Sequence, residues 1–483
     1  METSHLQRKL EARHLEFIVL GGTIGSAIFI ASGYSIATSG PTGAILGYVC
    51  TALFLYVVMS VLGEMATLIP ISGSFNEYGT RFVDPAFGFA MGWMYLVAWI
   101  STLAAELAAS VMLVHFWLPD MPSWIILIVF LSMLLLLNCI AIHVFGEIEF
   151  WLTAVKVFAI VITIFTSLVV VIKDDIGFKN FVATSDGVFP SGAIGVFGSM
   201  ITAFYSFGGA EMIGVAAGES ADPSKHVPRA VSSIFWSVSA FYILSIFMLS
   251  LLIPSTDPNL ILSSTTRNVR IAPFTLALQM AHLPSASQVM NAVILIASLS
   301  TCNSSLYASS RVLLALAVSK QAPSLFSVTT SRGLPLPALL FSTAVGCICF
   351  LGALIGNDFM YMILMRIAGI AYGLTWIGVC FISICFRRSI DKPTEEETID
   401  MNSPSTIAGN VRDSLFSRAS SSLPYRAPFP SIITVFGILF GLIVFSIDLY
   451  TQFTTPDNFM VQTATCCTFA IFVVMFVAFK IVF

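Results

Sequence analysis

An uninterrupted apolar stretch near the N-terminus limits the folds open to this chain more than any other feature. From Phe17 to Gly63 there is no Asp, Glu, Lys, Arg or His over 47 residues. About 20 helical residues cross a membrane, so the stretch is long enough for two crossings with a turn at 39–43. It predicts an integral membrane protein built of helices, because a helix satisfies its own backbone hydrogen bonds inside lipid.

Further apolar runs follow along the whole chain, and together with the first stretch they predict twelve membrane-spanning helices. These runs lie at about 86–114, 123–142, 149–172, 191–216, 230–253, 286–316, 335–356, 359–386, 431–452 and 460–482. The stretch 270–283 is also apolar, but it is short and Pro273 and Pro284 bound it. We expect it to lie on the membrane instead of crossing it.

The composition agrees with a membrane protein and excludes several classes of function. Apolar residues make up 57% of the chain and charged residues 10%, against about 25% charged residues in a soluble domain. The net charge of -4 and the scattered basic residues do not fit nucleic-acid binding, which needs a concentrated basic footprint. The nine cysteines lie in or beside apolar runs without metal-ligand spacing, so we expect apolar filler and no metal site.

The loops between the predicted helices differ in positive charge. If the N-terminus is cytoplasmic, the cytoplasmic segments hold fifteen Lys and Arg residues and the outer segments hold four. Positive residues favour the cytoplasmic side, so both termini are expected there. No cleavable signal peptide is expected, because the first apolar run continues as a full crossing. The polar segment 387–430 is expected to be a flexible cytoplasmic loop.

Two of the predicted helices contain glycine-rich interruptions. The first helix contains Gly21-Gly22-Thr23-Ile24-Gly25-Ser26, and the sixth contains Ser206-Phe207-Gly208-Gly209-Ala210-Glu211. Each begins a set of five helices, and paired interruptions of this kind indicate the binding site of a membrane transporter. On the glycines alone, a close-packed helix face with small residues four apart is an equally good interpretation.

The polar groups of the two interruptions favour a binding site. Once unwound, the first would present the backbone N–H groups of Gly22, Thr23, Ile24, Gly25 and Ser26 at the positive end of a half-helix, which suits a carboxylate. The sixth helix would present carbonyl groups near Phe207 and Gly208 at a negative helix end, which suits an ammonium group. The pair therefore predicts a pocket for an amino acid zwitterion.

Other side chains near this pocket are candidates with open alternatives. Phe204, Tyr205 and Phe207 sit at the second interruption, where a ring can close over a substrate or pack in the core. Asn303 lies in the eighth predicted helix. It is a candidate for lining the site or for a hydrogen bond between helices.

Five ionisable residues fall inside the predicted helices, where each costs about 2.5–3.5 kcal/mol on insertion. They are Glu64, Glu106, Lys156, Glu211 and Arg366. Lys156 can stand where a coupling cation would bind, and a buried lysine can lose its proton, so it is a candidate proton carrier. The alternatives are a lysine that reaches to the membrane surface or one fixed in an ion pair with a carboxylate such as Glu106.

The remaining charges also have more than one interpretation. Glu211 can gate the pocket, respond to substrate charge or titrate, or it can cap a helix end. Glu64 is expected to form a structural pair. Arg366 can pair with an acidic side chain of the substrate, with Glu211 or with Asp358. Because Arg366 favours acidic substrates while Glu106 and Glu211 favour basic ones, we expect a broad or neutral preference.

At these residues the sequence resembles the fungal amino acid permeases, the yeast amino acid transporter family within the amino acid, polyamine and organocation superfamily. The matching segments follow the family's order from about residue 11 to about residue 430. They are Arg13-His14-Leu15, Gly21-Gly22-Thr23-Ile24-Gly25, Ser39-Gly40-Pro41, Gly63-Glu64-Met65-Ala66-Thr67, Ile71-Ser72-Gly73-Ser74-Phe75, Arg81-Phe82-Val83-Asp84-Pro85-Ala86-Phe87-Gly88-Phe89, Ala104-Ala105-Glu106-Leu107, Ala216-Ala217-Gly218-Glu219-Ser220, Val227-Pro228-Arg229-Ala230, Gln321-Ala322-Pro323 and Leu423-Pro424-Tyr425-Arg426-Ala427-Pro428-Phe429.

The resemblance implies an all-α integral membrane fold with twelve transmembrane helices. Ten of these form a five-plus-five inverted repeat in which helices 1 and 6 are broken, and two more follow at the C-terminus. The expected segments are a cytoplasmic N-terminus (1–15), the first repeat (16–172), an extracellular loop (173–190), the second repeat (191–386), a cytoplasmic loop (387–430) and helices 11 and 12 (431–483).

The resemblance also implies roles for individual residues. Thr23, Ile24, Gly25 and Ser26 would hold the substrate carboxylate, and Phe207 and Gly208 its amino group. Tyr205 would be the gating aromatic residue, Glu211 the acid of helix 6, and Lys156 the cation of helix 5 that takes part in proton coupling. Glu106 and Glu211 are further candidates for proton coupling.

The chain departs from the family's usual pattern at two candidate specificity positions. Gly25-Ser26-Ala27 stands where the family usually reads Gly-Thr-Gly, so the methyl group of Ala27 intrudes where the family leaves the backbone bare. Arg366 stands where a small polar residue is typical.

The predicted function is proton-coupled uptake of an amino acid at the plasma membrane by alternating access. The proton is the expected coupling ion and no cofactor is expected, while the expected partners are an amino acid, protons and the lipid bilayer. A transporter-like amino acid sensor and a uniporter or exchanger of amino acids remain alternatives. An enzyme is not expected, because no nucleotide-binding loop, zinc-protease pair or catalytic triad spacing is present.

Overall fold

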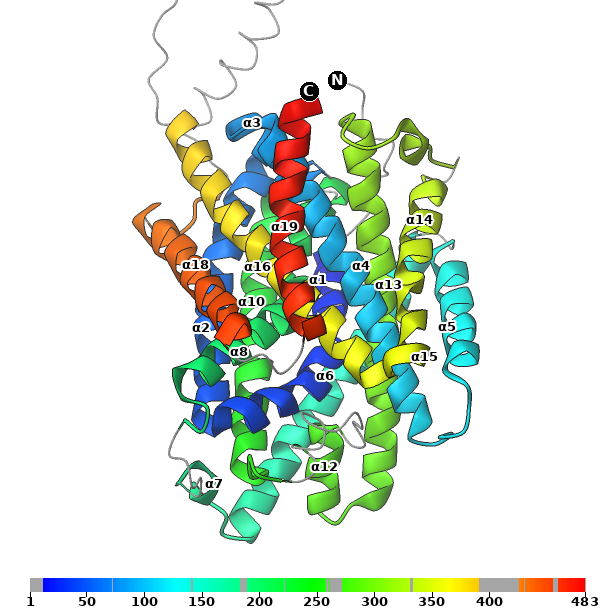
Figure 1. Cartoon of the computed structure of the whole chain (residues 1–483), viewed down its shortest axis with the longest axis vertical. Coiled ribbons are helices and arrows are strands. Elements are labelled where there is room, and N and C mark those ends of the chain that lie inside the picture. The colour runs from blue at the N-terminus through cyan, green and yellow to red at the C-terminus, as the bar shows by residue number, and fades with distance from the viewer. Residues whose placement is uncertain are drawn as a thin grey trace, which may run out of the picture.

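The computed structural model describes residues 12–71, 73–139, 142–182, 189–220, 222–257, 260, 272–330, 333–390, 425–429, 431–454 and 459–482. Every regular element in these ranges is a helix, and the helices form one elongated bundle (Figure 1). The prediction of an all-helical, multi-pass membrane protein is therefore confirmed. Most of the expected loop 387–430, and parts of the segments 1–15 and 173–190, lie outside the described residues.

The first apolar stretch forms a single bent and interrupted span. It consists of α1 (Ala12–Thr23), a π-helical turn η1 (Ala27–Ala31) and α2 (Ser32–Leu68). The chain is not helical at Ile24 and Gly25, and α2 bends at Gly40, whose φ is 71°. Pro41 follows the bend and has no backbone N–H to donate. The turn predicted at 39–43 is thus a sharp bend.

The later helices lie close to the apolar runs of the sequence. They are α3 (Ser74–Phe82), α4 (Pro85–His115), α5 (Ser123–Asn138), α6 (Ile142–Lys173), α7 (Lys179–Val182), α8 (Gly192–Phe207), η2 (Ala210–Met212), α9 (Ile213–Ala216), η3 (Ala217–Glu219), α10 (Pro223–Leu252), α12 (Pro273–Met280), α13 (Pro284–Val318), η4 (Ser324–Ser327), α14 (Leu336–Gly346), η5 (Cys347–Leu351), α15 (Gly352–Ile355), α16 (Asn357–Ile390), α18 (Ser431–Thr454) and α19 (Phe459–Val482).

Ten helices in the described part of the chain are long and apolar enough to cross a membrane, against the twelve predicted crossings. One of them, Val19–Leu68, is 50 residues long and contains both of the first two predicted crossings. The run predicted at 123–142 forms α5, an apolar helix of 16 residues. This is shorter than the roughly 20 residues that a straight crossing needs.

The sixth predicted helix is interrupted at its glycines. α8 ends at Phe207, and Gly209 has a φ of 100°, which residues with a side chain rarely adopt. The chain then continues through the short elements η2 and α9.

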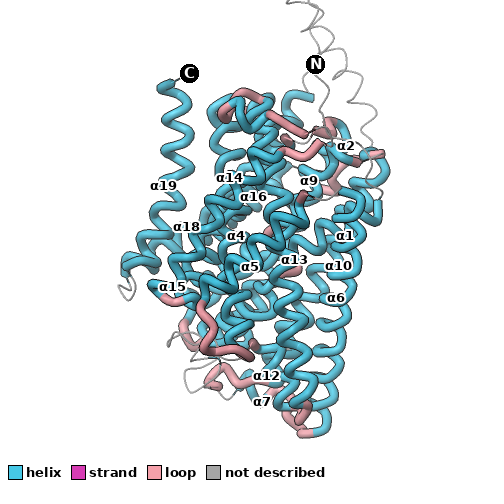
Figure 2. The backbone as a smooth tube through the Cα atoms, turned by 90° about the vertical axis from the view of Figure 1, so that its right-hand side faces the viewer, coloured by secondary structure: helices cyan, strands magenta, loops and turns pink. Residues whose placement is uncertain are grey.

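Short elements and ion pairs distinguish the two ends of the bundle. α3 lies at the end where α19 terminates, called here the α3 end, while α7 and α12 lie at the opposite end (Figures 1 and 2). At the α3 end, Arg387 pairs with Glu64 at 2.6 Å, and Lys480 pairs with Asp84 at 2.7 Å. The structural partner expected for Glu64 is therefore Arg387.

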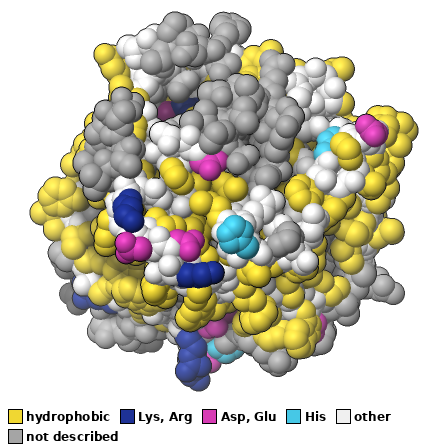
Figure 3. Space-filling view, turned by 90° about the horizontal axis from the view of Figure 1, so that it is seen from below, with side chains coloured by type: hydrophobic (Ala, Val, Ile, Leu, Met, Phe, Trp, Pro, Cys, Tyr) yellow, Lys and Arg dark blue, Asp and Glu magenta, His cyan; other side chains and the backbone are white. Residues whose placement is uncertain are grey.

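The centre and the outside of the bundle differ in burial. α4 packs along α13 and α16 and is buried over most of its length. α19 stands at the edge of the bundle in Figure 2 and exposes Val473, Val474 and Ile481. Seen from below, hydrophobic side chains also form much of the rim (Figure 3). An outer surface of this kind fits a lipid environment.

The stretch expected to lie on the membrane surface belongs to the bundle. α12 buries Phe274, Leu276 and Leu278 and packs against α6 and α13. The ring centroid of Phe274 lies 4.8 Å from that of Phe29. The prediction of a surface helix is therefore wrong, because the apolar side chains of α12 contact other helices.

Asp84 is expected to stabilise the start of α4 in a pH-dependent way. Its carboxylate accepts a hydrogen bond from the N–H of Ala86 at 2.8 Å and caps the helix. A hydrogen bond from Lys480, and then the one from Ala86, hold the pKa of Asp84 below its usual value. Asp84→Ala should therefore cost about 1 kcal/mol at neutral pH.

The pH dependence follows from the sign of that shift. The contribution of Asp84 is present at neutral pH and is lost as the pH falls below about 4, through the lowered pKa. Asp84→Asn keeps a capping oxygen but cannot titrate, so its thermal stability in detergent should fall less between pH 7 and pH 4. Equal losses in the two proteins would contradict this role.

Candidate functional site

The two interruptions are in contact with each other. A methyl group added to Gly209 would lie 3.3 Å from the backbone oxygen of Gly22 and 3.1 Å from the indole of Trp99. The ring of Tyr372 fills the space where a side chain at position 208 would lie. The glycines at both interruptions therefore face other parts of the protein. This contact is what the interpretation as a paired binding site requires.

The first interruption binds a carboxylate, but the carboxylate belongs to the chain itself. The backbone N–H of Ser26 donates to both oxygens of Glu106 on α4, at 3.0 and 3.1 Å. Ser298 donates to the same carboxylate at 2.6 Å, and the hydroxyl of Tyr205 donates at 3.1 Å. Glu106 is 1% exposed. It therefore occupies the position predicted for the carboxylate of a substrate.

Gly25 leaves the space that this arrangement needs. A methyl group at this position would lie 2.5 Å from Oε1 of Glu106 and 2.8 Å from Oγ1 of Thr301. Because overpacking costs about 1–3 kcal/mol, Gly25→Ala should lower the free energy of unfolding by about that amount. The matched control is Gly198→Ala, where nothing lies within 4 Å of the added methyl group. Similar thermal stability of the two purified variants in detergent would contradict the prediction.

Lys156 is fixed at the carbonyl end of α1. It is fully buried, and its ammonium group donates to the backbone oxygen of Gly21 at 2.8 Å. The hydroxyl of Thr301 also donates to this oxygen, at 3.2 Å. The alternative of a lysine that reaches to the membrane surface does not fit this position. Glu149 attracts Lys156 more strongly than Glu106 does.

Glu149 is a buried carboxylate that the sequence reasoning missed. Ser300 donates to its two oxygens at 2.7 and 2.8 Å, and Ser304 donates to one of them at 2.8 Å. The predicted helix began at residue 149, which made this glutamate a boundary residue. α6 starts at Ile142, so Glu149 lies within the helix and two turns before Lys156. An acid and a base seven residues apart on one helix were the available signal.

The side chain of Glu211 accepts hydrogen bonds at the second interruption. Both of its carboxylate oxygens accept from the N–H of Gly209 at 3.2 Å, and the indole of Trp376 donates to it at 3.1 Å. The residue is fully buried. These contacts are those of a capping carboxylate, one of the alternatives that the sequence left open. Each interruption thus has a buried glutamate that accepts from one backbone N–H, that of Ser26 or that of Gly209.

Aromatic side chains enclose the two interruptions. The ring of Phe207 lies 4.9 Å from that of Tyr242 and 6.0 Å from that of Tyr48. The hydroxyl of Tyr242 donates to the backbone oxygen of Thr23 at 2.9 Å, and that of Tyr361 lies 3.2 Å from the hydroxyl of Ser26. Sequence reasoning missed Tyr48, Tyr242 and Tyr361, because no motif marks them among the many aromatic residues of the helices.

Three predicted site residues have other surroundings. The ring of Phe204 lies 5.6 Å from that of Trp376 and 5.7 Å from that of Phe445, which is the core packing left open for it. Asn303 accepts a hydrogen bond from Asn138 of α5 at 2.7 Å, which is a bond between helices. Ala27 is buried at the start of η1.

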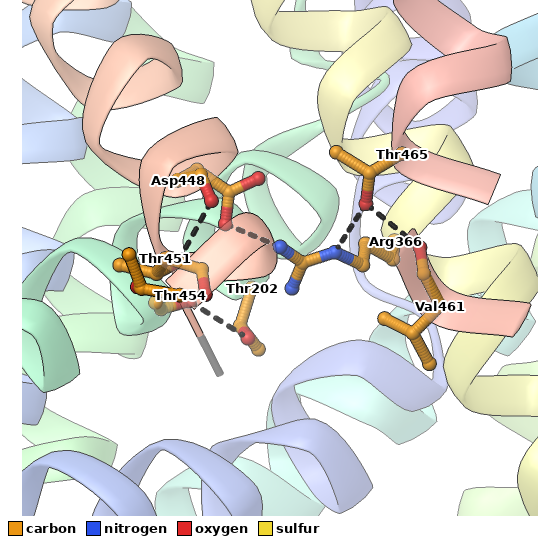
Figure 4. A network of polar contacts seen from close by, with 8 residues as sticks. Thr202, Arg366, Asp448, Thr451, Thr454, Val461 and Thr465 are labelled. Carbon is orange, nitrogen blue, oxygen red and sulfur yellow. Dashed lines mark hydrogen bonds and ion pairs between the residues drawn. The ribbon is translucent and has the colours of Figure 1, made fainter. Parts of the chain in front are cut away.

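Arg366 pairs with an acid that the sequence analysis did not consider. Its guanidinium group forms an ion pair with Asp448 of α18 and donates to the hydroxyl of Thr465 of α19 at 2.9 Å (Figure 4). The acid that pairs with Arg366 in the structure is thus a residue other than the expected Glu211 and Asp358. Asp448 is the only charged residue in the run 431–452, and this charge in a predicted helix was the missed signal.

Interrupted helices that meet inside a bundle are the way in which secondary transporters build their binding sites. The glutamates at the two interruptions and the lysine at a helix carbonyl end add the charges that such sites use. The arrangement defines the class of the protein as a membrane transporter.

The chain belongs to the amino acid permease family, whose model matches residues 14–399. It is 40% identical to the lysine-specific permease of Escherichia coli over 392 residues, which is 80% of each chain. It is also 40% identical to the histidine permease of Lactococcus lactis, over 80% of this chain and 81% of that protein. A general amino-acid permease of Candida albicans is 36% identical, over 80% of this chain and 66% of that protein.

A solved structure supports the fold. The crystal structure of the Eremococcus coleocola manganese transporter matches with a TM-score of 0.55 and 13% identity, over 99% of this chain and 97% of that one. At this identity the likeness concerns the fold alone. The family match and the permease relatives confirm that the chain is a transporter and not an enzyme. The relatives include bacterial and fungal permeases, so the broader amino acid permease family is the one shown.

Proposed function

We propose that this protein carries amino acids across the plasma membrane together with protons, by alternating access, with both termini in the cytoplasm. The observation that supports this most strongly is the contact between the two interruptions, each with a buried glutamate that accepts from a backbone N–H. Twelve crossings in a five-plus-five repeat are part of the proposal. The bend at Gly40 divides the first span in two, and α5 supplies a further short crossing.

Substrate binding is proposed to displace Glu106 from the first interruption. The substrate's carboxylate then accepts from the N–H of Ser26, and its amino group binds the carbonyl groups at the end of α8, around Phe207 and Gly208. A gating role for Tyr205 is supported by its hydroxyl, which donates a hydrogen bond to the carboxylate of Glu106 that must move. The exchange of one carboxylate for another keeps the charge at the positive helix end constant.

Proton coupling is proposed to involve Glu106, Glu211 and Lys156. Once released from Ser26, Glu106 is a buried carboxylate that needs a proton or a cation. Lys156 holds a positive charge on the carbonyl end of α1, where a coupling cation would otherwise bind. The proton is then the coupling ion, and no cofactor is needed.

The surroundings of the site favour a basic substrate over the broad or neutral preference that the sequence suggested. Asp448 balances the positive charge of Arg366, so Arg366 no longer favours an acidic substrate. Among the described residues, no ion pair involves Glu106 or Glu211. A cationic substrate would compensate one of these buried charges. Relatives described as lysine-specific and histidine permeases agree with this class.

The test is uptake of radiolabelled lysine, histidine, leucine and glutamate into proteoliposomes that hold the purified protein. We expect lysine uptake to exceed that of the others and to rise when the outside is made acidic. Preferential uptake of leucine or glutamate would overturn the substrate class. Uptake that ignores the pH gradient would favour a uniporter or exchanger, and binding without uptake would favour a sensor.

A further inference from the structure

A small cavity lies on the α3 side of the second interruption. Asn76 on α3, Tyr95 on α4, Val215 on α9 and Val312 on α13 are among its lining residues. Its volume is about 10 Å³, which is about what one water molecule needs. An amino acid does not fit into this space, so the cavity is no second substrate site.

Two polar atoms on the cavity wall have no hydrogen-bond partner among the residues that the structure describes. The side-chain oxygen of Asn76 is buried and accepts no hydrogen bond, while its nitrogen donates to Gln321 at 2.8 Å. The hydroxyl of Tyr95 is buried and forms no well-aligned hydrogen bond. Leaving such groups unpaired costs about 1–3 kcal/mol each, and buried waters typically satisfy groups of this kind.

The two atoms belong to a series of polar groups that begins at the second interruption. The hydroxyl of Tyr95 lies beside the carboxylate of Glu211. Beyond Asn76, the amide of Gln321 donates to the hydroxyl of Thr80 on α3 at 3.1 Å. Polar side chains therefore lie on both sides of the cavity, between the buried acid and the α3 end.

The groups that face Glu211 come from its own segment, α4 and α16. They are the N–H of Gly209, the indole of Trp376 and the hydroxyl groups of Tyr95 and Tyr372. None of these is a lysine, an arginine or a histidine. Beyond Thr80, the charged groups at this end of α3 are Glu77 and Arg81, which pair with each other.

We propose that the cavity holds one water molecule, and that Tyr95 and this water pass protons between Glu211 and the α3 end. The inference rests on the proposed coupling of transport to protons. The proton of Glu211 bonds to the oxygen of Tyr95 as the hydroxyl proton of Tyr95 moves to the water. The water then gives its extra proton to solvent at the α3 end, where the lining residues Gly73 and Ala315 are partly exposed, and Glu211 is left as a carboxylate. Asn76 orients the water by accepting a hydrogen bond from it.

Tyr95→Phe tests the relay, because it removes the hydroxyl and keeps the ring. The ring packs at 4.7 Å from Phe75 and 5.9 Å from Trp99, so the fold should persist. Uptake of labelled lysine driven by a pH gradient should fall about tenfold or more in proteoliposomes. Counterflow, in which labelled and unlabelled lysine exchange without net proton release, should stay close to the wild-type rate.

Two further variants serve as a control and as an independent test of the relay. Tyr78→Phe is the matched control, because it removes a buried hydroxyl that bonds the backbone oxygen of Ile69 outside the cavity. It should leave both rates unchanged. Asn76→Leu removes the other wall of the water site and should repeat the effect of Tyr95→Phe.

The outcomes separate the relay from the proposed function. A wild-type protein whose uptake ignores the pH gradient overturns the coupling, and the relay with it. If uptake by the wild-type protein follows the pH gradient and driven uptake by Tyr95→Phe is the same, the relay is overturned but the proposed coupling is not. Equal loss of counterflow and driven uptake in Tyr95→Phe also overturns it, because the residue then acts in folding or binding.

Discussion

Asp448→Leu is expected to lower the free energy of unfolding by about 3–5 kcal/mol, because it leaves the guanidinium group of Arg366 without its carboxylate. The side chains of Arg366 and Asp448 are only 14% and 3% exposed, so water cannot replace the lost partner. The remaining bond from Arg366 to Thr465 is to a neutral hydroxyl. The measurement is thermal unfolding of the purified protein in detergent.

The double variant Arg366→Met/Asp448→Leu should recover most of this loss, since it removes both charges together. The matched control is Lys480→Met, which breaks the ion pair with Asp84. That pair is more exposed, at 53% and 32%, so its loss should cost at most about 1 kcal/mol. If the double variant is as unstable as Asp448→Leu, Arg366 has a role beyond balancing Asp448.

Most boundaries of the helices were predictable, because apolar length and glycine position are local properties of the sequence, but α6 starts seven residues before the predicted run. The predicted run 359–386 corresponds to α16 (Asn357–Ile390), and both interruptions lie at the predicted glycines. The bend at Gly40 was also placed correctly. The position of α12 was not, since its composition does not say whether its apolar face meets lipid or protein.

The partners inside the bundle were not predictable, because they come from helices far apart in the sequence. Ser26 and Glu106 are 80 residues apart, and Arg366 and Asp448 are 82 apart. Sequence chemistry predicted the carboxylate of a substrate at the first interruption, and the structure has the carboxylate of Glu106 there. The sequence could not tell that α4 supplies one, because that depends on how the helices are rotated against each other.

Lys156→Met is expected to reduce uptake driven by a pH gradient by about tenfold or more. The substitution removes the ammonium group from the backbone oxygen of Gly21, at the end of α1 that leads into the first interruption. It also leaves Glu149 buried without the cation that attracts it. Both coupling and stability should therefore decline. The measurements are labelled lysine uptake with and without a gradient, and thermal unfolding.

The double variant Lys156→Met/Glu149→Gln separates these two effects. Glutamine keeps the shape of Glu149 and still accepts hydrogen bonds from Ser300 and Ser304, so the stability should return because no buried charge is left unbalanced. Driven uptake should remain low, because the missing ammonium group is the one proposed to act in coupling. Lys173→Met, at the exposed end of α6, is the matched control and should change neither measurement. Restored, gradient-dependent uptake in the double variant would show that Lys156 only balances Glu149.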